Sequence, residues 1–481
     1  MSKSAVRRVD AVLAVAGLAL SACFATTASA DDLFWTNLSG GIFSTGSNWN
    51  TGLPPVPASR VVFQLNSTYT VGFTSSAETS GLQVSAGRVT LDLNGFGLTI
   101  GGNTTIAGGG TSLSLLGNYT QSAGSFNLRE GASLSVGGAF NYTGNTEFVM
   151  RLGSTFSVGD QANSNVQSTG VFDIFNGGNV RLNNVTAGNH ATIADNGTSL
   201  SLLGNYTQSA GSFNLHEGAS LSVGGSLNFT GSGGFFVSGS GFTIGDPSAS
   251  SINAGLLTLQ DAQLSVRTVN VTTNASVSGA SARWDVRNGG TATVGIRLTL
   301  SDLATVDVSQ AGRMEIGTVS TSALSGQLRI GSGGTLAGNG TVIGDIVVEM
   351  GGTISPGFSP GLLNITGSLN LLSGSTLFLE VGGLGLGDFD RIALSGNPIL
   401  GGNLSLRFIN GFVPAPGSSF SLLTWGGSAS GTFDSVSITG IDPLLVNFNT
   451  AGGSFEVNVV PGPGAASLLG IGTLLGLRRR R

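Results

Sequence analysis

Apolar residues in the middle of the chain occur in pairs separated by one polar residue, and the pairs recur about every six to eight residues. Glycine, asparagine and serine separate one pair from the next. This alternation predicts short strands with one buried face, and three strands make a unit of about 20 to 24 residues. Helix is not expected outside the two ends of the chain. Representative pairs are Leu91/Leu93, Leu113/Leu115, Phe126/Leu128, Leu134/Val136 and Phe156/Val158.

A long segment of this pattern is duplicated. Residues 110–144 return 87 residues later as residues 197–231, and four of the 35 positions differ. The shift corresponds to about four units of roughly 22 residues. A segment can be copied in this way when each unit packs mainly on its neighbours. The differing pairs are Arg129/His216, Ala139/Ser226, Phe140/Leu227 and Tyr142/Phe229.

These patterns favour an all-β fold, a glycine-rich parallel β-helix over residues 85–370. Each strand would pair with its equivalent in the next coil, giving about 13 coils and a length of about 60 Å or more. The 79 glycines suit corners that repeatedly need a positive φ. The alternative is a set of antiparallel sandwich domains, which gives no reason for copying a four-unit segment in register.

The regions on either side of the repeats differ in composition. Residues 31–84 carry Trp35, Phe43 and Trp49, followed by three prolines, and are expected to form an N-terminal cap over the first coil. The alternative for the two tryptophans is a platform on which a carbohydrate stacks. Residues 371–458 are expected to form a C-terminal β cap.

Residues 1–30 have the layout of a signal peptide. Lys3, Arg7 and Arg8 precede a short apolar stretch, and small residues precede a cleavage point between Ala30 and Asp31. The apolar stretch is too short to cross about 30 Å of hydrocarbon. Export with cleavage by a signal peptidase is therefore predicted.

Cys23 offers a second way of processing the same end. The string Leu20-Ser21-Ala22-Cys23 resembles the lipobox of bacterial lipoproteins, in which the cysteine becomes the lipidated first residue. Cys23 is the one cysteine of the chain. Cleavage after Ala30 would leave a mature protein without any thiol, and hence without a disulfide or a thiolate metal site.

Residues 459–481, at the other end of the chain, also have the layout of a targeting signal. Pro461, Gly462 and Pro463 lead into an apolar stretch, residues 465–477, which would span roughly 20 Å as a helix. This stretch is only marginally long enough for a transmembrane segment, and it is followed by a basic tail that would stay on the cytoplasmic side. The tail consists of Arg478, Arg479, Arg480 and Arg481.

This layout resembles the PEP-CTERM sorting signal of Gram-negative bacteria, with Gly462 where that family usually has glutamate. The resemblance implies a transient inner-membrane anchor, an exosortase-type sorting enzyme as a partner, and a final location at the cell surface or outside the cell.

A second resemblance covers about 80 residues from Gly331 onward. The strings GTLAGNGTVIG and GGTISPGFSPG, and a turn of the form Asp-x-x-x-x-x-Gly that begins at Asp390, are similar to autotransporter-associated β-strand repeats. That resemblance implies the last coils of a β-helix and a closing cap. The outer-membrane barrel of an autotransporter does not follow, because the sorting tail begins soon after residue 458.

Charge argues against one class of partner. Residues 31–477 hold 24 acidic residues and 13 arginines without any lysine, a net charge of −11. Binding to nucleic acid by neutralising phosphates needs a basic surface, so no nucleic-acid partner is expected.

Candidate chemistry is sparse. Residues 357–361 spell a GxSxG string, but Pro360 follows Ser359 directly and no helix is expected after it, so Ser359 is interpreted as a turn residue. His190 and His216 are too few for a metal site, and His216 is replaced by Arg129 in the other copy. Glu380, Asp388 and Asp390 flank a glycine-rich turn. The preferred interpretation is a polar turn in the cap, and a calcium site is the alternative. On the preferred interpretation, no cofactor or metal is expected.

The most charged window is residues 283–315, and it carries the alternative function. A polysaccharide-degrading enzyme, a lyase or hydrolase, would need acids and arginines gathered in one groove. The interpretation preferred here is polar corners on successive coils. The candidates are Asp285, Asp302, Asp307, Arg283, Arg287 and Arg297.

The sequence as a whole predicts an exported protein without catalytic activity. Its long faces, poor in charge and rich in hydroxyl and amide groups, would suit contact with exopolysaccharide through many weak hydrogen bonds.

Overall fold

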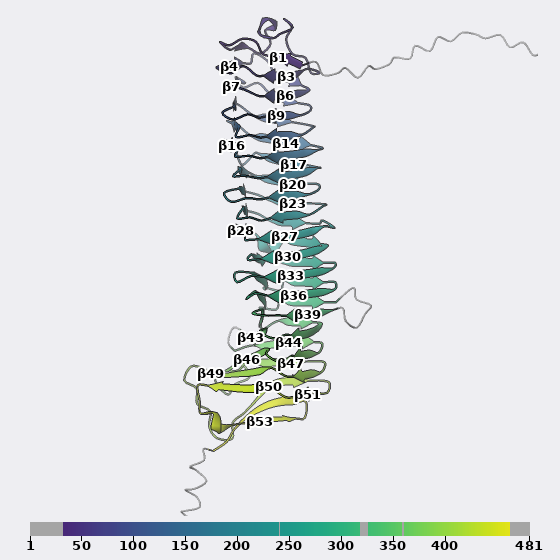
Figure 1. Ribbon diagram of the computed structural model, residues 1–481, viewed down its shortest axis with the longest axis vertical. Helices are drawn as coiled ribbons and strands as arrows, with labels where there is room; N and C mark the ends of the chain where they lie inside the picture. The colour runs from purple at the N-terminus through teal and green to yellow at the C-terminus, as the bar shows by residue number, and fades with distance from the viewer. Residues whose placement is uncertain (1–31, 240, 318–325, 358–359, 462–481) are drawn as a thin grey trace, which may run out of the picture.

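A computed structural model describes residues 32–239, 241–317, 326–357 and 360–461. These residues form a parallel β-solenoid whose coils stack along the long axis of the molecule (Figure 1). Helical conformation in this part of the chain is limited to three 3₁₀ turns, η1 (Gly46–Asn48), η2 (Pro247–Ala249) and η3 (Pro443–Leu445). No helix long and apolar enough to cross a membrane occurs among the described residues.

The first face of the solenoid is an 18-stranded sheet whose neighbours are all parallel. In order along the axis, its strands are β1 (Asp32–Phe34), β3 (Arg60–Phe63), β6 (Gly81–Val84), β9 (Thr104–Ile106), β12 (Phe126–Leu128), β15 (Glu147–Met150), β18 (Val171–Ile174), β21 (Ala191–Ile193), β24 (Phe213–Leu215), β27 (Gly234–Ser238), β30 (Leu256–Gln260), β33 (Asn274–Ser278), β36 (Arg297–Ser301), β39 (Gln327–Ile330), β42 (Asp345–Val348), β45 (Leu369–Leu371), β48 (Pro398–Leu400) and β51 (Ser430–Gly431).

The second face is built in the same way and ends in antiparallel pairing between β50 and β54 and between β54 and β53. Its strands are β5 (Ala77–Thr79), β8 (Leu98–Ile100), β11 (Tyr119–Gln121), β14 (Phe140–Gly144), β17 (Asn165–Ser168), β20 (Asn184–Ala187), β23 (Tyr206–Gln208), β26 (Leu227–Phe229), β29 (Ser251–Ala254), β32 (Thr268–Val271), β35 (Thr291–Val294), β38 (Arg313–Ile316), β41 (Thr341–Ile343), β44 (Leu362–Thr366), β47 (Arg391–Leu394), β50 (Ser419–Trp425), β54 (Ser454–Val459) and β53 (Val446–Ala451).

The third face is interrupted twice, between β16 and β19 and between β28 and β31. Its first block is β2 (Gly41–Ile42), β4 (Thr68–Gly72), β7 (Arg88–Asp92), β10 (Ser112–Leu116), β13 (Ser133–Val136) and β16 (Thr155–Val158). The second block is β19 (Asn179–Leu182), β22 (Ser199–Leu202), β25 (Ser220–Val223) and β28 (Gly241–Ile244). The third block is β31 (Gln263–Ser265), β34 (Arg283–Val286), β37 (Thr305–Val308), β40 (Thr335–Gly338), β43 (Thr353–Pro356), β46 (Thr376–Val381), β49 (Asn403–Phe408) and β52 (Ser435–Thr439).

The core runs inside the coils as ladders of stacked side chains. Phe126, Phe148 and Phe172 occupy equivalent positions on the first face, and their ring centroids lie 4.9 and 5.2 Å apart at interplanar angles of 11°. This separation is close to the spacing of about 4.8 Å between paired strands, so rings on successive coils stack without a shift in register. The apolar pairs read from the sequence thus point inward, as predicted.

The duplication corresponds to a shift of four coils. The first copy begins its strands at β10 and the second at β22, which is the fourth third-face strand after β10. The antiparallel sandwich is wrong as an alternative, because each strand of both copies pairs in parallel with its equivalent one coil away.

Both copies are followed by the same turn. After β16, the Ser164 hydroxyl donates to the Asp160 carbonyl at 2.5 Å and accepts from the Phe140 amide at 2.8 Å. After β28, Ser250 makes the equivalent bonds to Asp246 and Leu227, at 2.7 and 2.9 Å. The interruptions of the third face follow these turns, so the structural repeat continues beyond residues 144 and 231.

The coiling already begins at the first described residues. β1 pairs with β3 and β3 with β6 in the same sheet as the later coils, so the pairing is continuous across the domain boundary placed between residues 84 and 85. Trp35 and Trp49 are buried at the N-terminal end, with ring centroids 5.1 Å apart. They therefore fill the core and are not placed as an exposed platform for carbohydrate.

At the other end, β50, β53 and β54 close the second face with the antiparallel pairs described above. The division between residues 370 and 371, like the one after residue 458, stays a prediction. Both terminal signals, with Ala30, Asp31, Cys23, Gly462, Pro463 and the four final arginines, lie outside the described residues. Pro461 is described and exposed.

Candidate functional site

Hydroxyl side chains form rows on the outer surface of the third face. Strand geometry sends alternate residues to opposite sides, so the residues between the buried ones of each strand face solvent. The parallel register then brings equivalent residues of successive coils side by side. One row consists of Thr70, Thr90, Ser114, Ser135 and Ser157, each paired in register with the next.

A second row lies two residues away on the same strands and contains hydroxyls that bond to each other. Ser112, Ser133 and Thr155 are consecutive in register, and the Thr155 hydroxyl donates to Ser133 Oγ at 2.8 Å. The second copy repeats both rows with Ser199 and Ser201 on β22 and their partners on β25.

Amide side chains form a similar row on the second face. Asn165 Nδ2 lies 3.4 Å from Asn141 Oδ1, and Asn184 Nδ2 lies 2.9 Å from Asn165 Oδ1. Asn165 thus accepts from one neighbour in the row and donates to the other, and Asn184 Oδ1 also accepts the Asn205 amide at 2.7 Å. An amide can donate two hydrogen bonds and accept two, so these side chains retain part of their hydrogen-bonding capacity. The outer surface of these coils is therefore a regular array of uncharged donors and acceptors at about 4.8 Å intervals.

Four of the six residues proposed for an enzyme come together: Arg283 and Asp285 on β34, Arg287 directly after that strand, and Asp307 on the neighbouring strand β37. Arg283 Nε lies 2.7 Å from Asp285 Oδ1 and its Nη2 lies 2.5 Å from Asp307 Oδ2. Arg287 bridges the same two carboxylates, at 3.3 Å from Asp285 and closer to Asp307. Burial raises the pKa of Asp285, an effect that the guanidinium groups of Arg283 and Arg287 oppose. The negative charges of the two carboxylates are thus balanced by the positive charges of the two guanidinium groups.

The other two candidates lie elsewhere. Asp302 is exposed in the turn after β36, with a φ of 56°, and accepts a hydrogen bond from Ser301. Arg297 begins β36 on the first face and is also exposed. The sequence pattern correctly indicated charge in this window but did not distinguish the two faces of the coil.

The second interruption of the third face leaves two shallow hollows beside this ion-pair cluster. One, of about 190 Å³, is lined by Arg287, Arg267 and Pro247, and the other, of about 150 Å³, by Asp285, Phe242 and Pro247. The hollows arise because the turn with η2 stands between β28 and β31, so the two strands do not pair. Asp285 is the acid of the cluster that borders open space.

The remaining candidates have structural partners. The ring nitrogen Nδ1 of the exposed His190 accepts the Ser212 amide at 3.0 Å. His216 is 3.6 Å from Glu217, and its counterpart Arg129 reaches Glu147 instead. Ser359 lies outside the described residues.

Asp390 is a buried structural acid. It is 0% exposed, and its two carboxylate oxygens accept the backbone amides of Gly361, at 2.8 Å, and Glu380, at 2.9 Å. Burial raises the pKa of Asp390 to about 7, although both hydrogen bonds act to lower it. Asp388 instead caps its own turn by accepting the Gly385 amide at 3.0 Å. No three His, Cys, Asp or Glu side chains in the described part of the chain are grouped to hold a metal ion.

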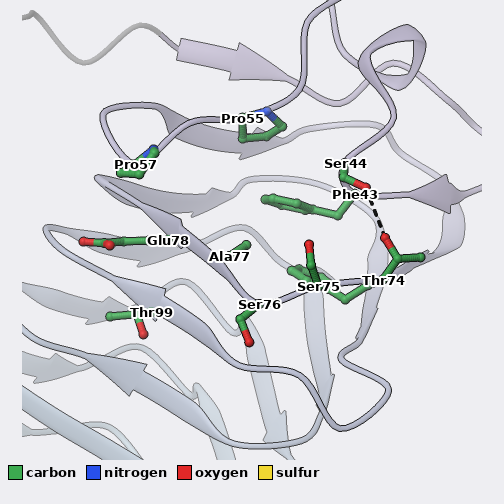
Figure 2. Close-up of a pocket in the computed structure, with 11 residues that line it drawn as sticks. Phe43, Ser44, Pro55, Pro57, Thr74, Ser75, Ser76, Ala77, Glu78 and Thr99 are labelled. Carbon is green, nitrogen blue, oxygen red and sulfur yellow. Dashed lines mark hydrogen bonds between the residues drawn. The ribbon is translucent and has the colours of Figure 1, made fainter.

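A pocket of about 470 Å³ lies at the N-terminal end, and the sequence analysis did not single it out. In Figure 2 the rings of Pro55 and Pro57 lie at the top of the view, with Phe43 below Pro55 and with Glu78 and Thr99 below Pro57. The lining is completed by Ser44, Phe73, Thr74, Ser75, Ser76 and Ala77. Three prolines close together in the sequence were the available signal, but their position over β5 depends on the fold.

The chain matches no protein-family model and no curated protein. The resemblances to the PEP-CTERM signal and to autotransporter-associated repeats therefore stay predictions from sequence, beside a fold that is described directly.

Proposed function

We propose that this is an exported protein without catalytic activity that contacts exopolysaccharide at the cell surface or in the extracellular matrix. The observation that carries the proposal is the pair of hydroxyl rows on the third face, together with the amide row on the second. A polysaccharide offers hydroxyl groups at regular intervals, and a rigid array of donors and acceptors can meet many of them at once. Each hydrogen bond adds only about 0.5 to 1.5 kcal/mol, so affinity would come from their number.

The experiment is a binding measurement with the mature protein and extracted exopolysaccharide. A variant with Ser114→Ala, Ser135→Ala, Ser201→Ala and Ser222→Ala removes four outward hydroxyls at equivalent positions of the two copies. We expect the affinity to fall about tenfold or more. Replacing the same four serines by threonine keeps the hydroxyls and is the matched control. The proposal is abandoned if the unaltered protein binds no exopolysaccharide and a deletion strain attaches to surfaces as the parent does.

The proposed location of the protein rests on the two terminal signals and has its own test. Intact mass spectrometry of the protein from envelope and medium fractions would support the proposal with a species that begins at Asp31 and lacks the arginine tail. That result would also support signal peptidase and an exosortase-type enzyme as processing partners. A lipidated Cys23 with the tail retained would mean that the protein is an envelope-anchored lipoprotein.

A polysaccharide lyase or hydrolase is the second candidate function, favoured by one observation. Asp285 borders the hollow beside Pro247 and has Asp307 as its neighbour in register. Against it, both acids are engaged by Arg283 and Arg287. Incubation with the extracted polysaccharide, followed by sizing of the products, tests this function. Cleavage that Asp285→Asn abolishes would replace the adhesive proposal.

A further inference from the structure

The pocket at the N-terminal end is held open by its own hydrogen bonds. The Trp49 indole N–H donates to the Phe43 carbonyl at 2.8 Å, and the rings of Phe43 and Phe73 stack at 4.5 Å. The proline loop, which is the loop that carries Pro55 and Pro57, is fixed as well. The Val56 amide donates to Ser59 Oγ at 3.1 Å, and the Ser80 hydroxyl donates to the Ala58 carbonyl at 2.9 Å. A ligand would therefore meet a preformed site.

The polar groups of the pocket are hydroxyls and one carboxylate. Ser44 Oγ and Thr74 Oγ1 lie 3.2 Å apart, and Ser76 Oγ accepts the Gly97 amide at 3.0 Å, so each retains further hydrogen-bonding capacity. Glu78 is exposed and has no ion pair or hydrogen bond to another described residue. Thr99, its neighbour in register on β8, places a further hydroxyl beside it.

We infer that this pocket binds a single neutral sugar ring, such as the end or a branch of a polysaccharide. A volume of about 470 Å³ lies within the range of small-molecule sites. Pro55 and Pro57 offer apolar surface to the C–H face of a sugar, and Glu78 can accept hydrogen bonds from two of its hydroxyls. The lining includes no arginine or lysine, and a second carboxylate beside Glu78 would be repelled. The site thus selects neutral sugars over uronates.

This inference rests on the proposed function, because that function supplies the polysaccharide from which the sugar comes. It adds the class of sugar that the pocket binds. The inference and the proposed function can nevertheless fail separately. The pocket and the hydroxyl rows are different surfaces, so monosaccharide binding reports on the first and polymer binding mainly on the second.

The test is titration of the full mature protein with neutral hexoses, N-acetylhexosamines and uronates, followed by protein-detected NMR or calorimetry. We expect millimolar binding of at least one neutral sugar and binding of uronates at least tenfold weaker. Glu78→Gln should weaken the neutral sugar about tenfold, because a hydrogen bond to a charged acceptor is stronger than one to an amide. Ser75→Trp should block the pocket and abolish binding. Glu130→Gln makes the same charge change at an exposed turn on a distant coil and should have no effect.

The inference is overturned if no neutral sugar binds while the polymer still does, a result that leaves the proposed function standing. It is also overturned if sugar binding survives both Glu78→Gln and Ser75→Trp. Sugar binding that both variants lose, with no polymer binding at all, would support the pocket and contradict the proposed function.

Discussion

Two buried polar side chains tie the solenoid together in different regions and with opposite chemistry. In the duplicated coils, Gln121 Nε2 lies 2.7 to 3.0 Å from the carbonyl oxygens of Gly102, Ala123 and Ser125. In the C-terminal coils, Asp390 accepts two backbone amides. Unpaired carbonyls require a donor, which a neutral amide supplies at any pH, whereas unpaired amides require an acceptor, and the acceptor here is a titratable acid. The comparison teaches that one fold can have pH-independent and pH-dependent regions.

The second copy of the duplicated segment repeats the neutral arrangement. Gln208 Nε2 lies 2.6 to 3.0 Å from the carbonyls of Asn189, Ala210 and Ser212, and the Tyr206 hydroxyl donates to its Oε1 at 2.7 Å. In the first copy the Tyr119 hydroxyl bonds to Gln121 Oε1 and also to the Thr104 hydroxyl at 2.7 Å. The equivalent of Thr104 on β21 is Ala191, which has no hydroxyl.

Removing the neutral amide should have the largest effect. Gln121→Ala leaves the carbonyls of Gly102 and Ala123 without their donor, whereas the Ser125 carbonyl keeps the Thr104 amide. The variant also opens a cavity, so we expect the free energy of unfolding to fall by about 4 kcal/mol. Gln208→Ala is the matched variant and should cost about the same. Chemical denaturation followed by circular dichroism measures both. A small loss of unfolding free energy in either variant would mean that water replaces the amide as the donor.

Titrating the acid should have the next largest effect. Because burial raises the pKa of Asp390 from 3.8 to about 7, its contribution to stability is fully present below pH 3.8 and is lost as pH rises through 7. Asp390→Asn removes this titration, so the free energy of unfolding of the variant minus that of the parent should rise by roughly 3 kcal/mol between pH 4 and pH 8. Denaturation at a series of pH values measures it. A difference that does not change with pH would contradict the raised pKa.

Altering the turn that Gln121 holds should have an intermediate effect. Gly124 lies in that turn with a φ of 73°, and an added Cβ would meet the carbonyl carbon of Gly102 at 2.5 Å. We expect Gly124→Ala to cost about 2 to 3 kcal/mol in thermal or chemical unfolding. Gly110 has a φ of 80° but open space around it, so Gly110→Ala should cost only about 1 kcal/mol. Equal losses would show that the close approach to the neighbouring coil is not important.

The smallest expected effect is a difference in stability between matched variants of the two copies. Tyr119→Phe removes the partner of Thr104 as well as that of Gln121, whereas Tyr206→Phe affects Gln208 alone. We expect Tyr119→Phe to lower the free energy of unfolding by about 1 kcal/mol more than Tyr206→Phe. A double-mutant cycle with Thr104→Val should remove this difference, and if it does not, the hydroxyl pair is not its source.

Much of the fold follows from local pattern. Alternating pairs such as Leu113/Leu115 indicated which side chains point inward, and the copied segment indicated that coils repeat. The interruptions of the third face were not predicted, because they depend on turns such as residues 245–250 standing over the next coil. Among the candidate residues, Asp285 and Asp307 were indicated together, but Asp302 was grouped with them by sequence proximity although it lies in an exposed turn.

The sequence by itself determined the strand period, the inward and outward sets of side chains, and the expected export and sorting signals, because these depend on residues a few positions apart. Only the tertiary structure decided which coils lie side by side. That placement aligned the serine and threonine rows, joined Arg283 to Asp307 across two strands, buried Asp390 against the Gly361 turn, and set the proline loop over Glu78. All four depend on contacts between residues about 20 or more positions apart, and a local pattern cannot specify such contacts until the coils are in register.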